Sequence, residues 1–222
     1  VSCRVCVDTS TVAHCHSYSS LIIDVAWWLW WRCRFWRPNA VDGFSVLGHI
    51  AERSHLENPS TYAVLVKEVG MDVEDEVPIL VPPSSFMLVW ADVGCNSEFG
   101  EVGIWKPVPP NENYVALGCV VTTSHQVPPS FDSVRCVHRD FAKPVKVHRI
   151  PPASGSGGSN ADATPGFLWS SQGTSAGIDC SVWLVEPTFD CILPNSFLIS
   201  ASNEAPPDSD AYCLRLAVQD SL

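Results

Sequence analysis

The chain has 222 residues, which is enough for one large β domain or two small ones. Hydrophobic residues make up 46% of it and charged residues 17%, a composition that excludes intrinsic disorder over most of the length. Asp and Glu total 24 against 13 Lys and Arg, and the formal net charge of −11 argues against nucleic-acid binding, because such a surface repels phosphates.

Strands rather than helices are predicted along the chain. Its 18 Pro and 13 Gly are spread too widely for long helices. Its nine Trp are typical of packed sheet faces, since the ring is large and rigid. We therefore expect an all-β protein.

Residues 1–34 form an N-terminal segment that we expect to include the first strands of a repeated unit. The run Leu21–Trp31 (LIIDVAWWLWW) is apolar except for Asp24 and spans 11 residues, whereas a membrane helix needs roughly 20. Arg4 is the only basic residue before this run, so no signal peptide is expected. We interpret the run as buried strand and predict no transmembrane segment.

A cluster of Cys and His lies at the start of this segment. It consists of Cys3, Cys6, His14, Cys15 and His16. Zinc needs four correctly aimed ligands, which a C-x-x-C pair followed by two His can supply. The gap from Cys6 to His14 is shorter than zinc fingers use, so we expect no metal here.

Three segments align as diverged copies of one unit: residues 35–69, 84–141 and 166–218. Each has a Trp, a turn residue 12 or 13 positions later, and a Pro 11 positions beyond that. The Trp are Trp36, Trp105 and Trp183, the turn residues are Gly48, Gly118 and Ser196, and the Pro are Pro59, Pro129 and Pro207.

Each copy is predicted to form about four strands. An upstream strand with its own Trp recurs at 87–90 and 167–169, and its place in the first copy falls near residues 21–25. Three four-stranded units favour a β-prism-like arrangement, in which three sheets share one core and few strand edges are exposed; paired β-sandwiches are the alternative. We expect Trp36, Trp105 and Trp183 to pack in that common interior rather than to stack on a ligand.

Two connecting segments differ from the repeats. Residues 70–77 are acidic, and their carboxylates are expected to be solvated, because the turn Gly of a calcium loop is absent. These carboxylates are Asp72, Glu74, Asp75 and Glu76. Residues 150–165 (IPPASGSGGSNADATP) are predicted to be a flexible linker or loop, and no helix follows their GSGGS run to present amides to phosphate.

The ten Cys leave the redox compartment open, although a reduced protein is favoured. Cys119, Cys136, Cys180 and Cys213 lie in apolar strand-like runs, where a free Cys acts as a small hydrophobic residue. The even count keeps a disulfide-bonded, secreted protein as the alternative.

No motif predicts catalysis. His49, His55 and His125 lie near the turns, and since His55 and His125 are equivalent in the repeat, shared ancestry explains them. Thr174 and Ser175 lack the strand–elbow–helix setting of a hydrolase nucleophile. We predict no enzyme, no cofactor and no catalytic or metal-binding residues, and the partner-binding residues stay unassigned.

One basic stretch stands out against the acidic composition. It contains Arg135, Arg139, Lys143, Lys146 and Arg149. We interpret it as a solvated strand edge and loop.

The central block NYVALGCVVTTSHQVPPSFDSVRCVHRDF resembles the plant and fungal family named for vacuolar protein sorting protein 62. The preceding IWKPVPP and FMLVW, together with GFSVLGHIAERSH, ILVPPSSFMLVW and FLWSSQGTSAGIDCSVWLVEP, extend the resemblance to roughly residues 35–190. The third copy departs from the pattern at Asn195-Ser196, where the others have Leu-Gly. The family is also distantly similar to the adaptor-binding repeats of bridge-like lipid-transfer proteins.

The resemblance implies a non-enzymatic β-rich binding module associated with vacuolar protein sorting or membrane trafficking. Its partner would be a protein or a lipid-associated molecule, and it would be cytoplasmic and peripheral to vacuolar or endosomal membranes. The alternative is a secreted, lectin-like or defence-related β-prism that binds carbohydrate or lipid, an inference from fold analogy alone.

Overall fold

The structure is a computed structural model. It describes residues 5–8, 19–27, 31–40, 43–52, 63–68, 77–93, 101–147, 166–172, 176–185, 188, 191–192 and 196–215, with side chains described from residue 33 onward. The linker predicted at 150–165, the carboxylates of the acidic segment and Pro59 lie outside these residues.

Within the described residues the regular elements are 18 short strands and two three-residue 3₁₀ turns, which confirms the all-β class. The first six strands are β1 (Val5–Asp8), β2 (Ser19–Trp27), β3 (Trp31–Pro38), β4 (Ser45–Val46), β5 (Ile50–Glu52) and β6 (Leu65–Glu68). The next six are β7 (Leu80–Val81), β8 (Ser85–Ala91), β9 (Gly103–Val108), β10 (Tyr114–Val115), β11 (Val120–Thr122) and β12 (Cys136–His138). The last six are β13 (Ala142–Pro144), β14 (Phe167–Ser170), β15 (Ser181–Trp183), β16 (Cys191–Ile192), β17 (Leu198–Ser200) and β18 (Tyr212–Arg215). The 3₁₀ turns are η2 (Arg139–Phe141) and η4 (Asp208–Asp210).

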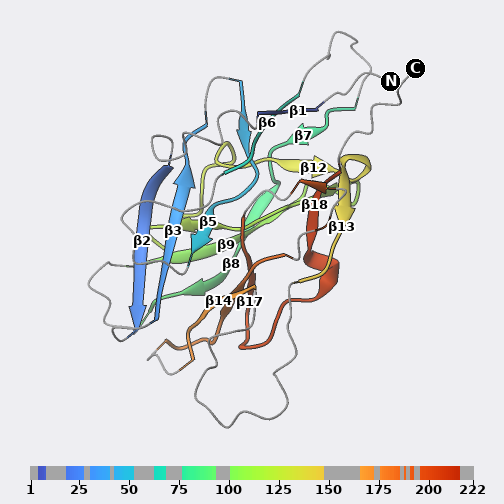
Figure 1. The fold of residues 1–222 in the computed structure, drawn as a ribbon. Helices are drawn as coiled ribbons and strands as arrows, with labels where there is room; N and C mark the ends of the chain where they lie inside the picture. The colour runs from blue at the N-terminus through green and yellow to red at the C-terminus, as the bar shows by residue number, and fades with distance from the viewer. Residues whose placement is uncertain are drawn as a thin grey trace, which may run out of the picture.

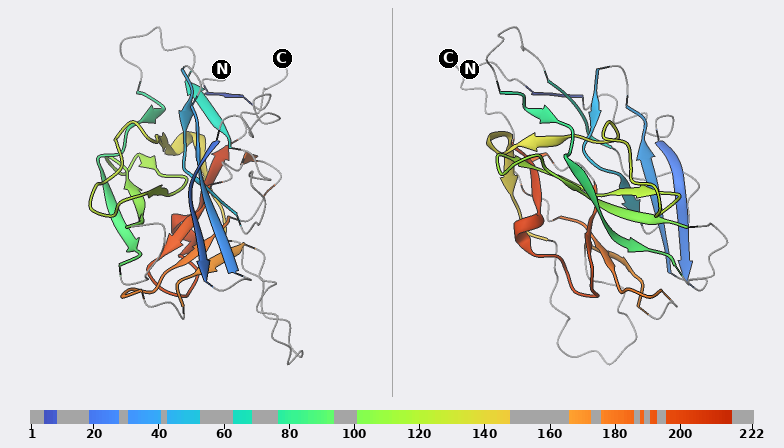
Figure 2. Two further views of the ribbon diagram at one scale, coloured as in Figure 1. Left: turned by 90° about the vertical axis from the view of Figure 1, so that its left-hand side faces the viewer. Right: turned by 180° about the vertical axis from the view of Figure 1, so that it is seen from behind.

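One antiparallel pairing scheme occurs three times along the chain. In each set of six consecutive strands, the second, third and fifth form one sheet, in the orders β2-β3-β5, β8-β9-β11 and β14-β15-β17. The first, sixth and fourth form another, in the orders β1-β6-β4, β7-β12-β10 and β13-β18-β16. We call these the outer and the end sheets. The β2–β3 and β13–β18 pairs lie at opposite sides of the molecule, with β8 and β9 between them (Figure 1 and Figure 2).

Each set has six strands, where the sequence predicted about four. The additional strands are short, and β4, β7, β10 and β16 have two residues each. Two residues carry no alternation of apolar and polar side chains, so nothing in the sequence marks them as strands. The prism geometry of the three sets stays a prediction.

The predicted upstream strand of the first copy is present as β2. Its pairing with β3 shifts register between Leu21 and Ile23, as the corresponding pairings shift between Leu88 and Trp90 and between Phe167 and Trp169. The residue before each shift pairs with Trp36, Trp105 or Trp183. A β-bulge therefore recurs opposite the same Trp in all three sets, and it increases the local twist of the sheet.

No helix in the described residues has the length and apolar character to span a membrane.

The third strand of each set is buried on both faces. Phe35, Ile104 and Val182 belong to a cluster that draws side chains from all three outer sheets. Trp36, Trp105 and Trp183 follow them directly, and because successive side chains on a strand point to opposite faces, they pack elsewhere. Trp36 packs with Ile50 and Ala63, and Trp183 packs in a separate cluster with Leu198 and Ala211.

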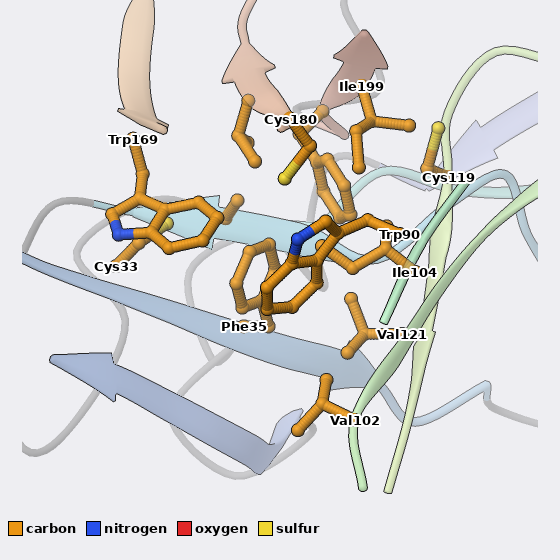
Figure 3. Packing of buried hydrophobic residues seen from close by; sticks show 13 residues of the cluster. Cys33, Phe35, Trp90, Val102, Ile104, Cys119, Val121, Trp169, Cys180 and Ile199 are labelled. Atoms are coloured by element: carbon orange, nitrogen blue, oxygen red, sulfur yellow. The ribbon is translucent and has the colours of Figure 1, made fainter. Parts of the chain in front are cut away.

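The expectation that these three Trp share a common interior is therefore wrong. Their burial is as predicted, but the Trp rings of the shared cluster are Trp90 and Trp169 (Figure 3). The two rings meet edge to face, with centroids 5.4 Å apart and planes inclined at 74°. We call this cluster the first core. Its buried members are Cys33, Phe35, Ala51, Trp90, Val102, Ile104, Cys119, Val121, Trp169, Cys180, Val182, Phe197 and Ile199.

A second core joins the three end sheets. Its buried members are Leu47, Val64, Val66, Ile79, Val115, Leu117, Val137, Ala142 and Leu214. Each set thus contributes one sheet to each core. Glu68 adds a polar link between the first two sets, because its carboxylate accepts the backbone N–H groups of Ile79 and Leu80 at 2.9 and 3.2 Å.

The three predicted turn residues meet at one point between the two cores. A Cβ added to Gly48 would lie 2.8 Å from Ser196 Cβ and 2.9 Å from Gly118 Cα, and one added to Gly118 would overlap the Ser196 side chain. The backbone N–H of His49 donates to Cys119 O at 2.9 Å, and that of Cys119 donates to Phe197 O at 3.1 Å. The Ser196 hydroxyl donates to Leu117 O at 2.6 Å. Backbone hydrogen bonds thus join consecutive turns, and the backbones of these turns lie in van der Waals contact.

The proline of the third copy lies one residue earlier than the spacing of the repeat predicted. Pro129 is buried and lies seven residues before Cys136, which occupies the same place in β12 as Cys213 does in β18. Pro206 is the buried proline seven residues before Cys213, whereas Pro207 is exposed and precedes η4. Pro206, rather than Pro207, therefore corresponds to Pro129.

The cysteines also differ from expectation at one position. Cys119 and Cys136 are buried free thiols, as predicted, and burial raises the pKa of each to about 12, while Cys180 is buried and not in a disulfide. Cys213 is disulfide-bonded to Cys191. The pair was missed because Cys191 and Cys213 come close only once β16 pairs with β18.

Replacing Gly118 by Ala is expected to destabilise the protein by about 3 kcal/mol or more, because a methyl group has no space where the turns meet. Chemical denaturation measures the change. Gly177→Ala is the matched control, since a Cβ there meets nothing within 4 Å, and its effect should stay within about 0.5 kcal/mol.

The double variant Gly118→Ala/Ser196→Gly should recover part of the lost stability, since the nearest atoms to the new methyl belong to the Ser196 side chain. Strictly additive effects of the two substitutions would contradict this packing.

Candidate functional site

A cavity of about 310 Å³ lies between the first and second sets of strands. The first set contributes two residues to its wall and the second set contributes the rest. The lining residues are Arg37, His49, Val120, Thr122, Thr123, Ser124, Val127, Pro128, Pro129, Ser130 and Ser133. The volume is at the lower end of the range for small-molecule sites.

Both residues from the first set are placed by the elements described above. Arg37 follows Trp36 near the end of β3, and its side chain is exposed. His49 follows Gly48 at the meeting point of the turns and is only 2% exposed. The second set supplies the turn after β11 and the loop that holds Pro129.

His49 has a buried hydrogen-bonding atom without a partner. Its Nδ1 accepts the backbone N–H of Val121 at 3.1 Å, so in the neutral imidazole the proton is on Nε2. Nε2 is buried and has no hydrogen-bond partner in the structure. An unsatisfied buried donor is costly, and the surrounding protein covers this nitrogen, so the cost is part of the folded state.

The charge state of His49 follows from its surroundings. Burial, and secondarily the positive charge of Arg37, lowers its pKa from 6.5 to about 3. The imidazole is therefore neutral near pH 7. It is poorly suited to be a general base, because Nδ1 is occupied by Val121 and Nε2 already carries the proton.

Hydroxyl groups of the second set also line the cavity. Thr122 Oγ1 accepts Trp105 Nε1–H at 2.7 Å and donates to Ser124 O at 2.7 Å. Ser133 Oγ donates to Ser130 O at 2.6 Å. The Ser124 and Ser130 hydroxyls each accept a backbone N–H at 3.3 Å, which leaves their own protons available to a ligand.

The wall has a positive charge in an acidic protein. Arg37 is the charged residue among the described lining residues, and none of them is a carboxylate. The lining thus joins this cation and several hydroxyl groups to the apolar residues Val120, Val127, Pro128 and Pro129.

Other sequence candidates lie apart from this cavity. His125 does not line it; its backbone N–H donates to Glu101 O at 2.6 Å, and its Nδ1 is buried without a partner. Cys6 lies in β1 with its side chain undescribed. The other members of the N-terminal Cys/His cluster, together with His55, Thr174 and Ser175, fall outside the described residues. In the part of the chain that the structure describes, no group of three His, Cys, Asp or Glu could hold a metal.

The basic stretch has local partners rather than a ligand surface. Arg135 forms an ion pair with Asp132 at 3.1 Å. Arg139 donates to Glu112 O at 2.5 Å and to the Tyr212 hydroxyl at 2.9 Å. Lys146 is exposed, and Arg149 is outside the described residues.

Sequence reasoning did not single out the cavity. His49 was interpreted as a turn residue, while its equivalents in the other sets are Cys119 and Phe197, both members of the first core. A polar ring at a position that is otherwise apolar was the available signal. This signal points to a cavity only together with Arg37 and the Thr122–Ser124 turn, and that turn is far from His49 in the sequence.

Fold and site together define an all-β protein with a small cavity between two of its strand sets. The sequence profile described as "Vacuolar protein sorting-associated protein 62" (Vps62) matches residues 30–218, and the chain belongs to this family. Among curated proteins none matches the chain.

Among solved structures, the crystal structure of GNIP1Aa from Chromobacterium piscinae has a similar fold, with a TM-score of 0.67 at 18% sequence identity. The match covers 96% of this chain and 37% of GNIP1Aa, so the chain corresponds to a minor part of that protein. At this identity the similarity concerns the fold alone.

Stability should fall as the pH drops from 6.5 towards 3. The unfolded chain binds a proton at His49 below pH 6.5, whereas the folded chain does so only near pH 3, so the contribution of His49 to stability rises with pH across this interval and is constant above it. The expected slope is about 1.4 kcal/mol for each pH unit.

His49→Asn isolates this contribution in denaturation measurements over a pH series. Asn keeps an acceptor for the Val121 N–H and does not titrate. The difference in unfolding free energy between wild type and variant should shrink with acidification, and a difference independent of pH would show that His49 titrates normally.

Proposed function

We propose that this protein is a non-enzymatic binding module that acts in vacuolar protein sorting, and that its ligand occupies the cavity between the first and second sets of strands. Membership of the Vps62 family carries the link to sorting. The Arg37 guanidinium beside the hydroxyl groups of the second set carries the choice of the cavity. The module would act in the cytoplasm at the surface of vacuolar or endosomal membranes.

The chemistry of the cavity supports binding over catalysis. A general base needs a free acceptor with a pKa near the working pH. His49 has its acceptor occupied by Val121 and a pKa of about 3. Arg37 and the hydroxyl groups are suited to orient a bound molecule by hydrogen bonds.

The rigidity of the wall also supports binding. His49 is held from both sides, by its backbone N–H to Cys119 O and by its ring to the Val121 N–H. Both bonds cross from the first set of strands to the second. A wall whose polar groups are fixed before the ligand arrives loses less entropy on binding.

Deletion of the gene should cause a soluble vacuolar hydrolase to appear in the growth medium, and re-expression of the full chain should restore its retention. Thr123→Trp should restore it poorly, because Thr123 is an exposed residue of the cavity wall and an indole there fills the space without changing charge. Immunoblotting of medium and cells measures the secreted fraction.

Gln126→Trp is the matched control, since Gln126 is exposed in the same turn and does not line the cavity. Normal sorting after deletion would contradict the proposed function. Binding of the purified chain to a glycan array, with normal sorting, would instead favour the lectin-like alternative.

A further inference from the structure

We propose that the Cys191–Cys213 disulfide is a reversible redox bond, which a dithiol reductant opens at Cys191, and that opening it releases strand β16 from β18. The bond is separate from the cavity, since every described lining residue belongs to the first two sets. The inference rests on the proposed function only for its cytoplasmic setting.

The compartment decides whether such a bond is permanent. In the cytoplasm, glutathione and thioredoxin keep thiols reduced, so disulfides there are usually transient, catalytic or redox-sensing. Two other described cysteines are poor partners for exchange. Burial raises the pKa of Cys119 and of Cys136 to about 12, so neither supplies the thiolate that thiol–disulfide exchange requires. Neither thiol therefore competes with an external reductant for the disulfide.

The two sulfur atoms of the bond differ in their access to a reductant. Cys213 is fully buried, in a cluster with Trp183, Leu198 and Ala211. Cys191 packs against this cluster and is only partly buried. Exchange requires a thiolate to reach one sulfur of the bond, and access determines which one is attacked. Cys191 is therefore the site of attack.

The dithiol alone balances the exchange. Its thiolate attacks Cys191 Sγ, which forms a mixed disulfide and expels Cys213 as a thiolate that takes up a proton from solvent. The second thiolate of the reductant then attacks the reductant's own sulfur in the mixed disulfide and expels Cys191, which is protonated in turn. The protein gains two electrons and two protons, and the dithiol loses them as it becomes a disulfide. Two glutathione molecules can replace the dithiol, one in each step.

Thr188 favours the second step. Its Oγ1 lies 2.7 Å from Cys191 Sγ. In the reduced protein this hydroxyl can donate to the Cys191 thiolate, and a hydrogen bond to the charged form of a group favours that form. A thiol that ionises more readily is also a faster leaving group in exchange. The position of Thr188 thus promotes the release of Cys191 from the mixed disulfide.

The second set contains the same pair of strands without a disulfide. Cys136 in β12 corresponds to Cys213 in β18. By the same registers, Tyr114 in β10 lies where the third set has Cys191. Both residues of β10 are buried, and the Tyr114 hydroxyl donates to Pro78 O at 2.7 Å. Non-covalent contacts therefore hold β10 in place.

Strand β16 is less buried than β10. Both of its residues, Cys191 and Ile192, are only partly buried, and it pairs with β18 over two residues at the edge of the third end sheet. A short edge strand with little buried surface has low local stability. The disulfide joins residues 22 positions apart and restricts the opened state of this part of the chain. Opening the bond should therefore release β16 and uncover the backbone edge of β18.

Peptide mapping of the purified full chain tests the bond directly. The chain is equilibrated in glutathione buffers of graded reduced-to-oxidised ratio, quenched with acid, alkylated and digested. Cleavage after Glu204 places Cys191 and Cys213 on separate peptides. At the cytosolic ratio both should be reduced, and oxidised glutathione should restore the bond. The glutathione adduct at short times should form on Cys191, in about tenfold excess or more over Cys213.

Hydrogen exchange measured by mass spectrometry tests the release of β16. Reduction should speed exchange in peptides that contain β16 and β18 by about tenfold or more, because the disulfide no longer restricts the opened state. Peptides that contain β10 and β12 should not change, since Cys136 is not in a disulfide.

Three variants separate the parts of the proposal. Cys191→Ser should show the fast exchange of the reduced wild type and no response to glutathione. Thr188→Val should lengthen the lifetime of the adduct on Cys191, because the hydroxyl beside the leaving thiolate is lost. Cys136→Ala is the matched control, since it removes the equivalent cysteine of the second set and should leave the response of the third set unchanged.

A bond that survives the cytosolic glutathione ratio until the chain unfolds would overturn the proposal and indicate a permanent structural disulfide, as in a secreted protein. An adduct mainly on Cys213, or unchanged exchange in β16 and β18 after reduction, would overturn it too. An unchanged adduct lifetime in Thr188→Val would contradict the role given to Thr188.

These measurements use the purified chain, so the redox bond and the proposed function can fail separately. A chain that restores sorting but keeps its disulfide contradicts only the redox bond. A chain whose bond is reversible but which is dispensable for sorting contradicts only the proposed function.

Discussion

The structure depends on the close approach of three backbone turns at Gly48, Gly118 and Ser196. The approach leaves no space for a larger residue, since an added Cβ at Gly48 would lie 2.9 Å from Gly118 Cα. It also allows the backbone hydrogen bonds from His49 to Cys119 and from Cys119 to Phe197. Residues before the turns, such as Leu117, enter the second core, and residues after them, such as Phe197, enter the first. The contact thus fixes how all three strand sets divide their side chains between two cores.

The candidate site arises where the three sets differ from one another. At the position after the turn, the second and third sets place Cys119 and Phe197 in the first core, while the first set has His49. The imidazole remains neutral at that depth because burial lowers its pKa, and one nitrogen accepts a backbone N–H. Its other nitrogen is buried without a protein partner.

Much of the fold could be predicted from sequence because the three copies share nearly the same intervals between equivalent residues. The Trp–turn–Pro intervals located the meeting turns, and the described residues of the apolar run, 21–27 and Trp31, lie in strands as predicted. The orientation of the Trp rings was predicted wrongly, because alternation along β3, β9 and β15 places Phe35, Ile104 and Val182 in the first core instead. The Cys191–Cys213 disulfide and the cavity depend on residues that become neighbours only after strand pairing. No interval in the sequence encodes such contacts, so reasoning from single motifs could not find them.

Native-state hydrogen exchange of the backbone amides tests most directly whether the meeting turns hold the three sets together. If they do, the His49 and Cys119 amides exchange only through global unfolding, and their exchange free energies equal the free energy of unfolding from denaturation. Amides in the middle strands β3, β9 and β15 should open with them in one cooperative unit. Exchange of His49 or Cys119 at a much lower free energy than those strands would show that the sets are stable without the contact, and would contradict this account.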